Sequence, residues 1–216
     1  MYAGTWQFDS ERWPEKEKPA SDLVAVAQRC AGRRIVTPSH YAAVERLRNG
    51  SVVHIRAMRP ADRNEFIAAF ERTSAQTRYR RFFALKKGLT EADLDFSLNV
   101  DFVNHVALAA TLEDSDARQL LVGAGRYVVS AERVAELALM VDDTHQGLGI
   151  GTQLMRHLIL IARNAGLHAF EAEVLSANAP MLDVFKHCGL PMTTRHEVGV
   201  VRVRLDLAPE LVTKQG

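Results

Sequence analysis

Residues 134–164 read VAELALMVDDTHQGLGIGTQLMRHLILIARN, and this stretch decides the fold. The apolar run Val134 to Val141 predicts a strand, and the segment from about 149 to 165 has the apolar spacing of an amphipathic helix. Gly147, Gly149 and Gly151 lie at the junction of the two. Glycines let the backbone approach a ligand, and free amides at a helix start, together with the helix dipole, favour an anion. The junction therefore predicts a phosphate-binding turn.

The glycine spacing of this turn differs from that of the common nucleotide-binding motifs. A Rossmann fingerprint needs a glycine three residues after the second one, where Thr152 stands. A P-loop needs Gly-Lys-Ser/Thr, which this stretch lacks. Both common nucleotide folds are therefore disfavoured. The loop alone is also compatible with close packing of the chain in which no ligand is bound.

The segments on either side predict a mixed α/β domain with a central sheet. Tyr41 to Leu47 fits a helix or the first arm of a hairpin, and Asn49-Gly50 favours the hairpin because it accepts the positive φ angles of a tight turn. Further strands are predicted at 52–57, 105–111, 119–130, 134–141, 168–174 and between 192 and 207. Helices are predicted at 59–71, 76–83, 90–99, 149–165 and 178–187. The three successive strands from 105 to 141 suggest an antiparallel meander.

The composition excludes several classes of protein. The 27 basic and 26 acidic side chains nearly cancel, so no global field predicts nucleic acid or a membrane surface as the partner. Cys30 and Cys188 are too few for a disulfide scaffold, and neither they nor the scattered histidines have the spacing of metal ligands. Neither a signal peptide nor a membrane span is predicted. We expect a reduced, cytoplasmic protein without a metal.

Two motifs in the correct order resemble the GNAT superfamily of N-acetyltransferases. The family signature is a strand followed by Gln/Arg-x-x-Gly-x-Gly/Ala at a helix start, filled here by Gln146, Gly149 and Gly151. The next family element is a helix with an Asn, an apolar residue, an aromatic residue and a Gly, matched by Asn178, Met181, Phe185 and Gly189. The resemblance implies a GNAT fold, with a central, mostly antiparallel mixed sheet flanked by helices.

A closer likeness covers about residues 47 to 190. The segments LRNGSVVHIRAMRPADR, SAQTRYRRFF and LTEADLDFSLNVDFVNHVALAA are similar to bacterial protein lysine acetyltransferases that modify acyl-CoA synthetases. Those relatives often carry a cyclic-nucleotide domain or a synthetase-like domain, for which the residues before Leu47 are too few. We expect residues 1–46 to be an N-terminal extension with a short helix from Ser21 to Gly32, residues 47–207 the GNAT domain, and 208–216 a tail.

The resemblance implies acetyl-CoA as the cosubstrate and assigns it a site. Backbone amides of one loop would hold the pyrophosphate, and the loop residues are Gln146, Gly147, Leu148, Gly149, Ile150, Gly151 and Thr152. The backbone of Leu139, Met140 and Val141 would pair with the pantetheine arm like an extra strand. Asn178 would add a hydrogen bond to that arm, or it would simply cap its helix. Gln146 is neutral where many relatives have Arg, so phosphate affinity would rest on amide dipoles more than on charge.

Glu136 is the candidate general base, because the Ala-Glu-x-Ala pattern of the relatives carries their catalytic glutamate. It would act through a water; the alternatives are a solvent-facing carboxylate or a pair with Arg133. His145 is the reserve base, although it fits a role in the turn better. Phe185 stands where many GNAT enzymes have a tyrosine that protonates the CoA thiolate, so the thiolate would leave unaided or take a proton from water. Cys188 fits packing better than nucleophilic chemistry.

The most basic segment interleaves arginines with aromatic residues, namely Arg78, Tyr79, Arg80, Arg81, Phe82 and Phe83. It could contact an acidic protein surface or the 3′-phosphate of CoA, or it could be a solvated helix face. No nucleic-acid motif accompanies it.

The resulting hypothesis is acetyl-CoA-dependent transfer to a protein lysine, for example on an acyl-CoA synthetase, by direct attack of the amine in a ternary complex. One alternative is the same chemistry on a small amine or an amino acid. Another is a non-catalytic module that senses acyl-CoA, which the phenylalanine at 185 keeps open. A homodimer is one option for assembly.

Overall fold

The computed structural model describes residues 37–114, 116, 118–130 and 133–207. The helix expected at 21–32 and the tail at 208–216 lie outside the described residues. Within the described ranges, no helix is long and apolar enough to span a membrane.

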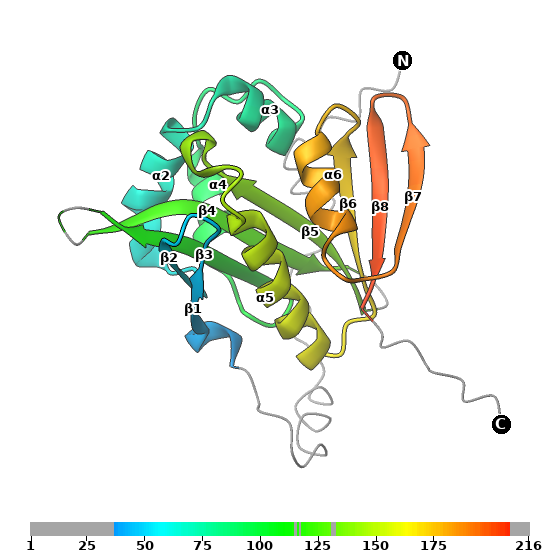
Figure 1. The fold of residues 1–216 in the computed structure, drawn as a ribbon, viewed down its shortest axis with the longest axis horizontal. Helices are drawn as coiled ribbons and strands as arrows, with labels where there is room; N and C mark the ends of the chain where they lie inside the picture. The colour runs from blue at the N-terminus through cyan, green and yellow to red at the C-terminus, as the bar shows by residue number, and fades with distance from the viewer. Residues whose placement is uncertain (1–36, 115, 117, 131–132, 208–216) are drawn as a thin grey trace, which may run out of the picture.

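Eight strands of the described chain form one sheet in the order β1-β2-β3-β4-β5-β6-β8-β7 (Figure 1). The strands are β1 Ala42–Arg46, β2 Val52–Ala57, β3 His105–Glu113, β4 Gln119–Val129, β5 Val134–Val141, β6 Ala169–Leu175, β7 Met192–Glu197 and β8 Val200–Asp206. Every neighbouring pair is antiparallel except β5 and β6, which are parallel. The expected mostly antiparallel mixed sheet is therefore confirmed, including the meander β3-β4-β5.

The first two strands form the hairpin that Asn49-Gly50 favoured. Gly50 has a φ of 87°, and Leu47 N donates to Ser51 O at 2.8 Å across the turn. A helix for Tyr41 to Leu47 was therefore the wrong alternative. β1 is hydrogen-bonded to β2 along its whole length, so the sheet starts ahead of residue 47, where the sequence suggested that the domain begins.

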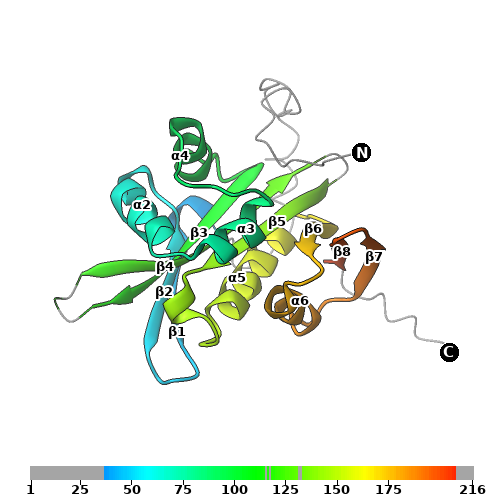
Figure 2. The same cartoon turned by 90° about the horizontal axis from the view of Figure 1, so that it is seen from above.

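Helices cover both faces of the sheet. They are α2 Arg63–Glu71, α3 Ala75–Phe82, α4 Glu91–Leu98, α5 Ile150–Asn164 and α6 Ala179–Lys186, with short 3-10 turns η1 Pro38–His40, η2 Pro60–Asp62 and η4 Asp143–His145. Figure 2 shows α2 and α4 on one side and α5 and α6 on the other. Alternation along β3 divides the core accordingly: Ala107 and Ala109 pack with α2 and α4, whereas Val106 and Leu108 pack in the cluster that contains α5.

Two glycines on β4 let α5 approach the sheet closely. A Cβ at Gly123 would lie 3.2 Å from Ile150 Cγ2, and one at Gly125 would lie 3.0 Å from Leu158 Cδ1 and 2.7 Å from Leu139 Cδ2. Larger residues would force α5 away from the strands. The absence of side chains here brings the start of α5 next to the end of β5.

The strands β5 and β6 separate soon after they meet. Their pairing covers only Val134, Ala135 and Glu136 on β5, although β5 continues to Val141 and β6 to Leu175. β5 stays bonded to β4 over this whole length, while β6 stays bonded to β8. Beyond Glu136, the edge of β5 that faces β6 therefore has no strand partner among the described residues.

Candidate active site

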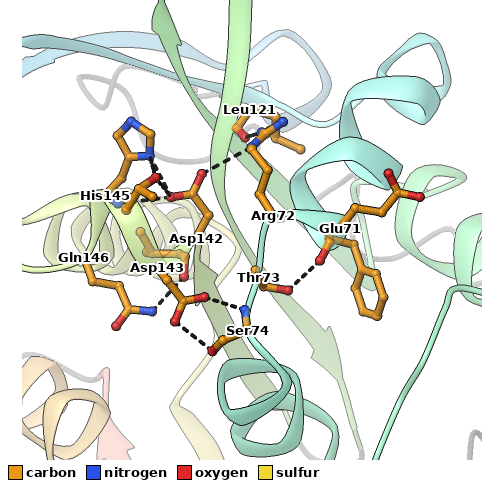
Figure 3. A network of polar contacts seen from close by, with 12 residues as sticks. Glu71, Arg72, Thr73, Ser74, Leu121, Asp142, Asp143, His145 and Gln146 are labelled. Carbon is orange, nitrogen blue, oxygen red and sulfur yellow. Dashed lines mark hydrogen bonds and ion pairs between the residues drawn. The ribbon is translucent and has the colours of Figure 1, made fainter.

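The turn after β5 is held by a buried carboxylate (Figure 3). Asp142 is 2% exposed, and its Oδ1 accepts hydrogen bonds from His145 N at 3.0 Å and from Thr144 Oγ1 at 2.9 Å. His145 Nδ1 lies 2.6 Å from the same oxygen, and Arg72 Nε lies 3.6 Å from Oδ2. His145, the reserve base, is thus bound to a structural carboxylate and helps to fix the turn.

A second carboxylate ties the turn to α3. Asp143 accepts hydrogen bonds from Ser74 N at 2.7 Å, Ser74 Oγ at 2.9 Å and Thr77 Oγ1 at 2.7 Å. Burial raises the pKa of Asp143, but these hydrogen bonds outweigh burial and hold the pKa below its usual value. Asp143 is therefore ionised at neutral pH, and the turn is fixed from both sides.

The side chain of Gln146 is also committed to the turn. Its Nε2 donates to Val141 O at 3.1 Å and to Thr77 Oγ1 at 3.4 Å. A glutamine held in this way shapes the loop.

The glycines leave open space above the start of α5. Gly147 and Gly149 have φ angles of 78° and 96°, which L side chains rarely adopt, and Gly149 is the N-cap of α5. The atoms nearest to a Cβ at Gly149 are Arg48 Cγ and Nε, both at 3.8 Å. The first amides of α5 and the positive end of its dipole thus face a space bordered by a cation.

Arg48 is a candidate site residue that the sequence reasoning missed. It lies in the β1–β2 hairpin, and its backbone N donates to Leu148 O at 3.3 Å, which fastens the hairpin to the loop. The side chain lines the same cleft as the loop. No local pattern marks Arg48, because the contact joins segments far apart in the sequence.

A cleft of about 1330 Å³ runs from this loop along the open edge of β5. The expected site residues that line it are Glu136, Leu139, Met140, Val141, Gln146, Gly147, Gly149, Ile150, Gly151, Thr152, Asn178 and Phe185. Leu148 is not among the lining residues, because its side chain packs against the hydrophobic core instead. The expected contact of the Leu148 backbone amide with a phosphate stays a prediction, and the other expected residues line the cleft.

Backbone direction distinguishes the three residues at the end of β5. Asp142 N donates to Val122 O on β4 at 3.0 Å. Because successive residues of a strand direct their backbone groups to opposite sides, Met140 also directs its N–H and C=O to β4. Leu139 and Val141 direct theirs to the open side, where Val141 O already accepts from Gln146. Met140 contributes only its side chain to the cleft.

Glu136 lies where the two strands begin to separate. It is half-buried, lines the cleft, and is aligned with Val128 on β4 and Glu171 on β6.

Asn178 is 8% exposed and caps α6, since its Oδ1 accepts from Met181 N at 3.4 Å. Phe185 is 1% exposed, so it supplies a buried apolar wall. Burial raises the pKa of the Cys188 thiol, which disfavours a thiolate nucleophile.

The arginine-rich segment divides between two roles. Arg78 turns away from the cleft: it stacks on Phe70 at 4.4 Å and donates to Glu71 O at 3.1 Å. Arg80 and Arg81 line the cleft together with Phe82. Only part of this segment is therefore a solvated or structural helix face.

Residues 79–190 match the family model described as the acetyltransferase (GNAT) family. The chain belongs to the GNAT acetyltransferase family. It is 34% identical over 160 residues to acetyltransferase PA5475 of Pseudomonas aeruginosa. The aligned region covers 73% of this chain and 84% of that protein. It is 31% identical over 165 residues to acetyltransferase Pat of Mycolicibacterium smegmatis, which covers 76% of this chain but only 48% of that relative. This GNAT chain thus matches about half the length of that relative.

Solved structures agree with the GNAT assignment. The GNAT domain of S. lividans PAT superposes with a TM-score of 0.70 at 33% identity, covering 76% of this chain and 96% of that domain. The yncA acetyltransferase of Salmonella typhimurium, solved with its cofactor acetyl-CoA, gives a TM-score of 0.60 at 19% identity over 76% of this chain and 99% of its own. The second likeness supports the fold.

Proposed function

We propose that this GNAT chain transfers an acetyl group from acetyl-CoA to the side-chain amine of a protein lysine. The observation that carries the proposal is the cleft that joins the glycine-capped start of α5 to the open edge of β5 and to Glu136. The resemblance to protein lysine acetyltransferases favours a protein acceptor over a small amine.

The residues present fit acetyl-CoA. A pyrophosphate would accept hydrogen bonds from the amides at the start of α5, and Arg48 would supply the positive charge that Gln146 lacks. The N–H and C=O of Leu139 and the N–H of Val141 would pair with the pantetheine arm as an added strand. Phe185 and Met140 would enclose its apolar part, while Asn178 keeps α6 in place beside it.

The chemistry requires a neutral amine. A lysine of pKa about 10.4 is neutral in only about one part in 2,500 at pH 7, which costs roughly 4.6 kcal/mol. When bound, acetyl-CoA supplies the acetyl group as a thioester, which the neutral amine attacks to form an amide and release the CoA thiol. Positioning contributes about 7–11 kcal/mol to such reactions, and Glu136 would remove the amine proton through a water, adding about 10²- to 10⁴-fold. The amide of Leu139 would polarise the acetyl carbonyl.

The test is release of CoA thiol from acetyl-CoA with a purified acyl-CoA synthetase as acceptor, with mass spectrometry of that protein and a parallel panel of small amines. Acetylation of a synthetase lysine would support the proposal. Turnover only with a small amine would replace the protein acceptor, and saturable binding of acetyl-CoA without any turnover would favour the sensing module. Glu136→Gln serves as the matched control, because it should keep acetyl-CoA binding and slow turnover.

A further inference from the structure

The cleft contains a group of cations that neither the acetyl-CoA site nor Glu136 explains. Arg126 on β4 stacks on Phe96 at 4.6 Å and donates to Ser97 Oγ at 3.3 Å. Arg81 on α3 lies over the ring of Phe82 at 5.2 Å. Both arginines and both rings line the cleft on the side of α3 and α4. The aromatic rings and the serine hold the two guanidinium groups in place without neutralising them.

The two arginines lack a matching negative charge. Lys86 Nζ lies 5.1 Å from the centroid of the same Phe82 ring and forms an ion pair with Asp93 Oδ1 at 2.7 Å. Asp93 also accepts hydrogen bonds from Thr90 N and Thr90 Oγ1, both at 2.7 Å, so this carboxylate is already engaged. Among the described residues, neither Arg81 nor Arg126 forms an ion pair with a carboxylate. The carboxylate of Asp93 is thus engaged by Lys86 and Thr90, and it forms an ion pair with neither arginine.

Burial and mutual repulsion make this arrangement unfavourable without an anion. Burial lowers the pKa of Arg126 well below its ordinary value, the charge of Arg81 lowers it further, and Asp93 opposes both effects. Burial lowers the pKa of Arg81 to about 10. Another arginine of the same cleft, Arg202, is paired with Glu173 at 3.1 Å and Glu197 at 3.0 Å. A half-buried charge without such a partner carries a desolvation cost that a bound anion would offset.

The strand register places Arg126 close to the proposed reacting centre at Glu136. Arg126 is aligned with Ala138, and Val128 with Glu136, on adjacent strands. Positions 126 and 136 are therefore diagonal neighbours on one face of the sheet, with their Cβ atoms about 7 Å apart. A carboxylate bound by Arg126 would lie within one side-chain length of an amine held near Glu136.

We propose that Arg81 and Arg126 bind a carboxylate of the acceptor, so that the preferred protein lysine has an acidic residue beside it. This inference rests on the proposed function, because it places the acceptor amine at Glu136. The guanidinium group presents a planar fork of donors that fits both oxygens of a carboxylate, so two such forks select a carboxylate over an amide of the same shape.

The experiment compares two peptides that differ only in a glutamate or a glutamine next to the single lysine, with acetyl-CoA as donor. The wild-type protein should show a kcat/KM about tenfold or more higher for the glutamate peptide, the size expected for a charge-assisted hydrogen bond. Arg126→Gln and Arg81→Gln should abolish this preference. The kcat/KM for the glutamine peptide and the KM for acetyl-CoA should stay nearly unchanged. Arg202→Gln, a change of the same kind in the same cleft, should keep it.

In the peptide comparison, two outcomes would overturn the inference while the acetyltransferase function stands. One is an equal kcat/KM of the wild-type protein for the glutamate and the glutamine peptide. The other is a loss of kcat/KM in Arg126→Gln that is equal for both peptides, which would indicate a structural role for Arg126. Succinyl-CoA with the glutamine peptide tests the other source of a carboxylate. If Arg126→Gln impairs only the use of succinyl-CoA, the carboxylate belongs to the acyl chain and the acceptor assignment is wrong.

Failure of the proposed function would appear differently, as no acetylation of any amine by the wild-type protein. The carboxylate site can then be tested by calorimetry with succinate as the probe. Saturable binding that Arg126→Gln abolishes and Arg202→Gln retains would support the site, and absence of binding to the wild-type protein would overturn it.

Discussion

Replacing Gly149 by aspartate tests the placement of the pyrophosphate, with Gly166→Asp as the matched control. The two glycines have φ angles of 96° and 74°, and a Cβ would meet only Arg48 at 3.8 Å in the first case and no described atom within 4 Å in the second. Gly149 begins α5, while Gly166 follows the end of that helix and does not line the cleft. The two changes share the backbone strain and differ in their distance from the proposed phosphate.

Two effects can be estimated for these changes: the loss of stability from backbone strain and the loss of acetyl-CoA affinity from charge repulsion. A side chain in the left-handed region costs about 1–2 kcal/mol, which corresponds to a loss of roughly 2–8 °C in Tm for a chain of this length, and both variants should show it. Only at Gly149 would the new carboxylate oppose a phosphate about 4 Å away, at a cost of about 1–4 kcal/mol, depending on the effective dielectric constant. It would also attract Arg48 away from the cofactor. We expect the Kd for acetyl-CoA to rise about tenfold or more in Gly149→Asp alone.

The assay is calorimetric titration with acetyl-CoA, together with thermal unfolding of both variants. An unchanged Kd in a folded Gly149→Asp protein would refute the placement of the pyrophosphate at the start of α5. An equal rise in Gly166→Asp would attribute the effect to strain rather than to charge.

Three further changes probe the remaining parts of the site. Arg48→Ala should weaken acetyl-CoA binding severalfold and reduce the salt dependence of that binding. Arg46→Ala, the control in the same hairpin, removes only a 3.1 Å hydrogen bond to Gly50 O and should change neither quantity. Titrations with acetyl-CoA at two salt concentrations check both expectations. Glu136→Gln should lower kcat about 10²- to 10⁴-fold with an unchanged Kd for acetyl-CoA; equal turnover would remove this residue from the mechanism. Asp143→Asn should lower stability at neutral pH. Because the folded pKa of Asp143 lies below the unfolded value of about 3.9, its stabilisation is present above that value and disappears as the pH falls through the folded pKa; unfolding curves of both proteins should therefore converge in acid.

Much of the fold could be predicted from the sequence, because the decisive signals are local. The alternating runs of the meander and the dipeptide Asn49-Gly50 specify strands and a turn within a few residues of chain. The glycines at 147 and 149 indicate positive φ angles, which both residues adopt. The same motif indicated the GNAT family, which the family comparison confirms.

The tertiary structure alone decided how the site is assembled. The separation of β5 from β6 after Glu136 depends on how two strands pack with their other neighbours, which neither strand encodes. Arg48 reaches Gly149 only because a hairpin from the start of the described chain lies against the loop. Periodicity cannot show that Leu148 turns to the core, since that direction depends on what surrounds the loop.

The arginines show the same division most clearly. The sequence marks a basic, aromatic segment at 78–83, but only packing turns Arg78 onto Phe70 and leaves Arg81 in the cleft. Arg126 has no local signal, because its position beside Glu136 follows from strand register. Local chemistry thus determined the elements and the glycine-rich turn of this protein. Contacts between distant segments decided which charges meet in the cleft, because register and packing, rather than sequence proximity, set those distances.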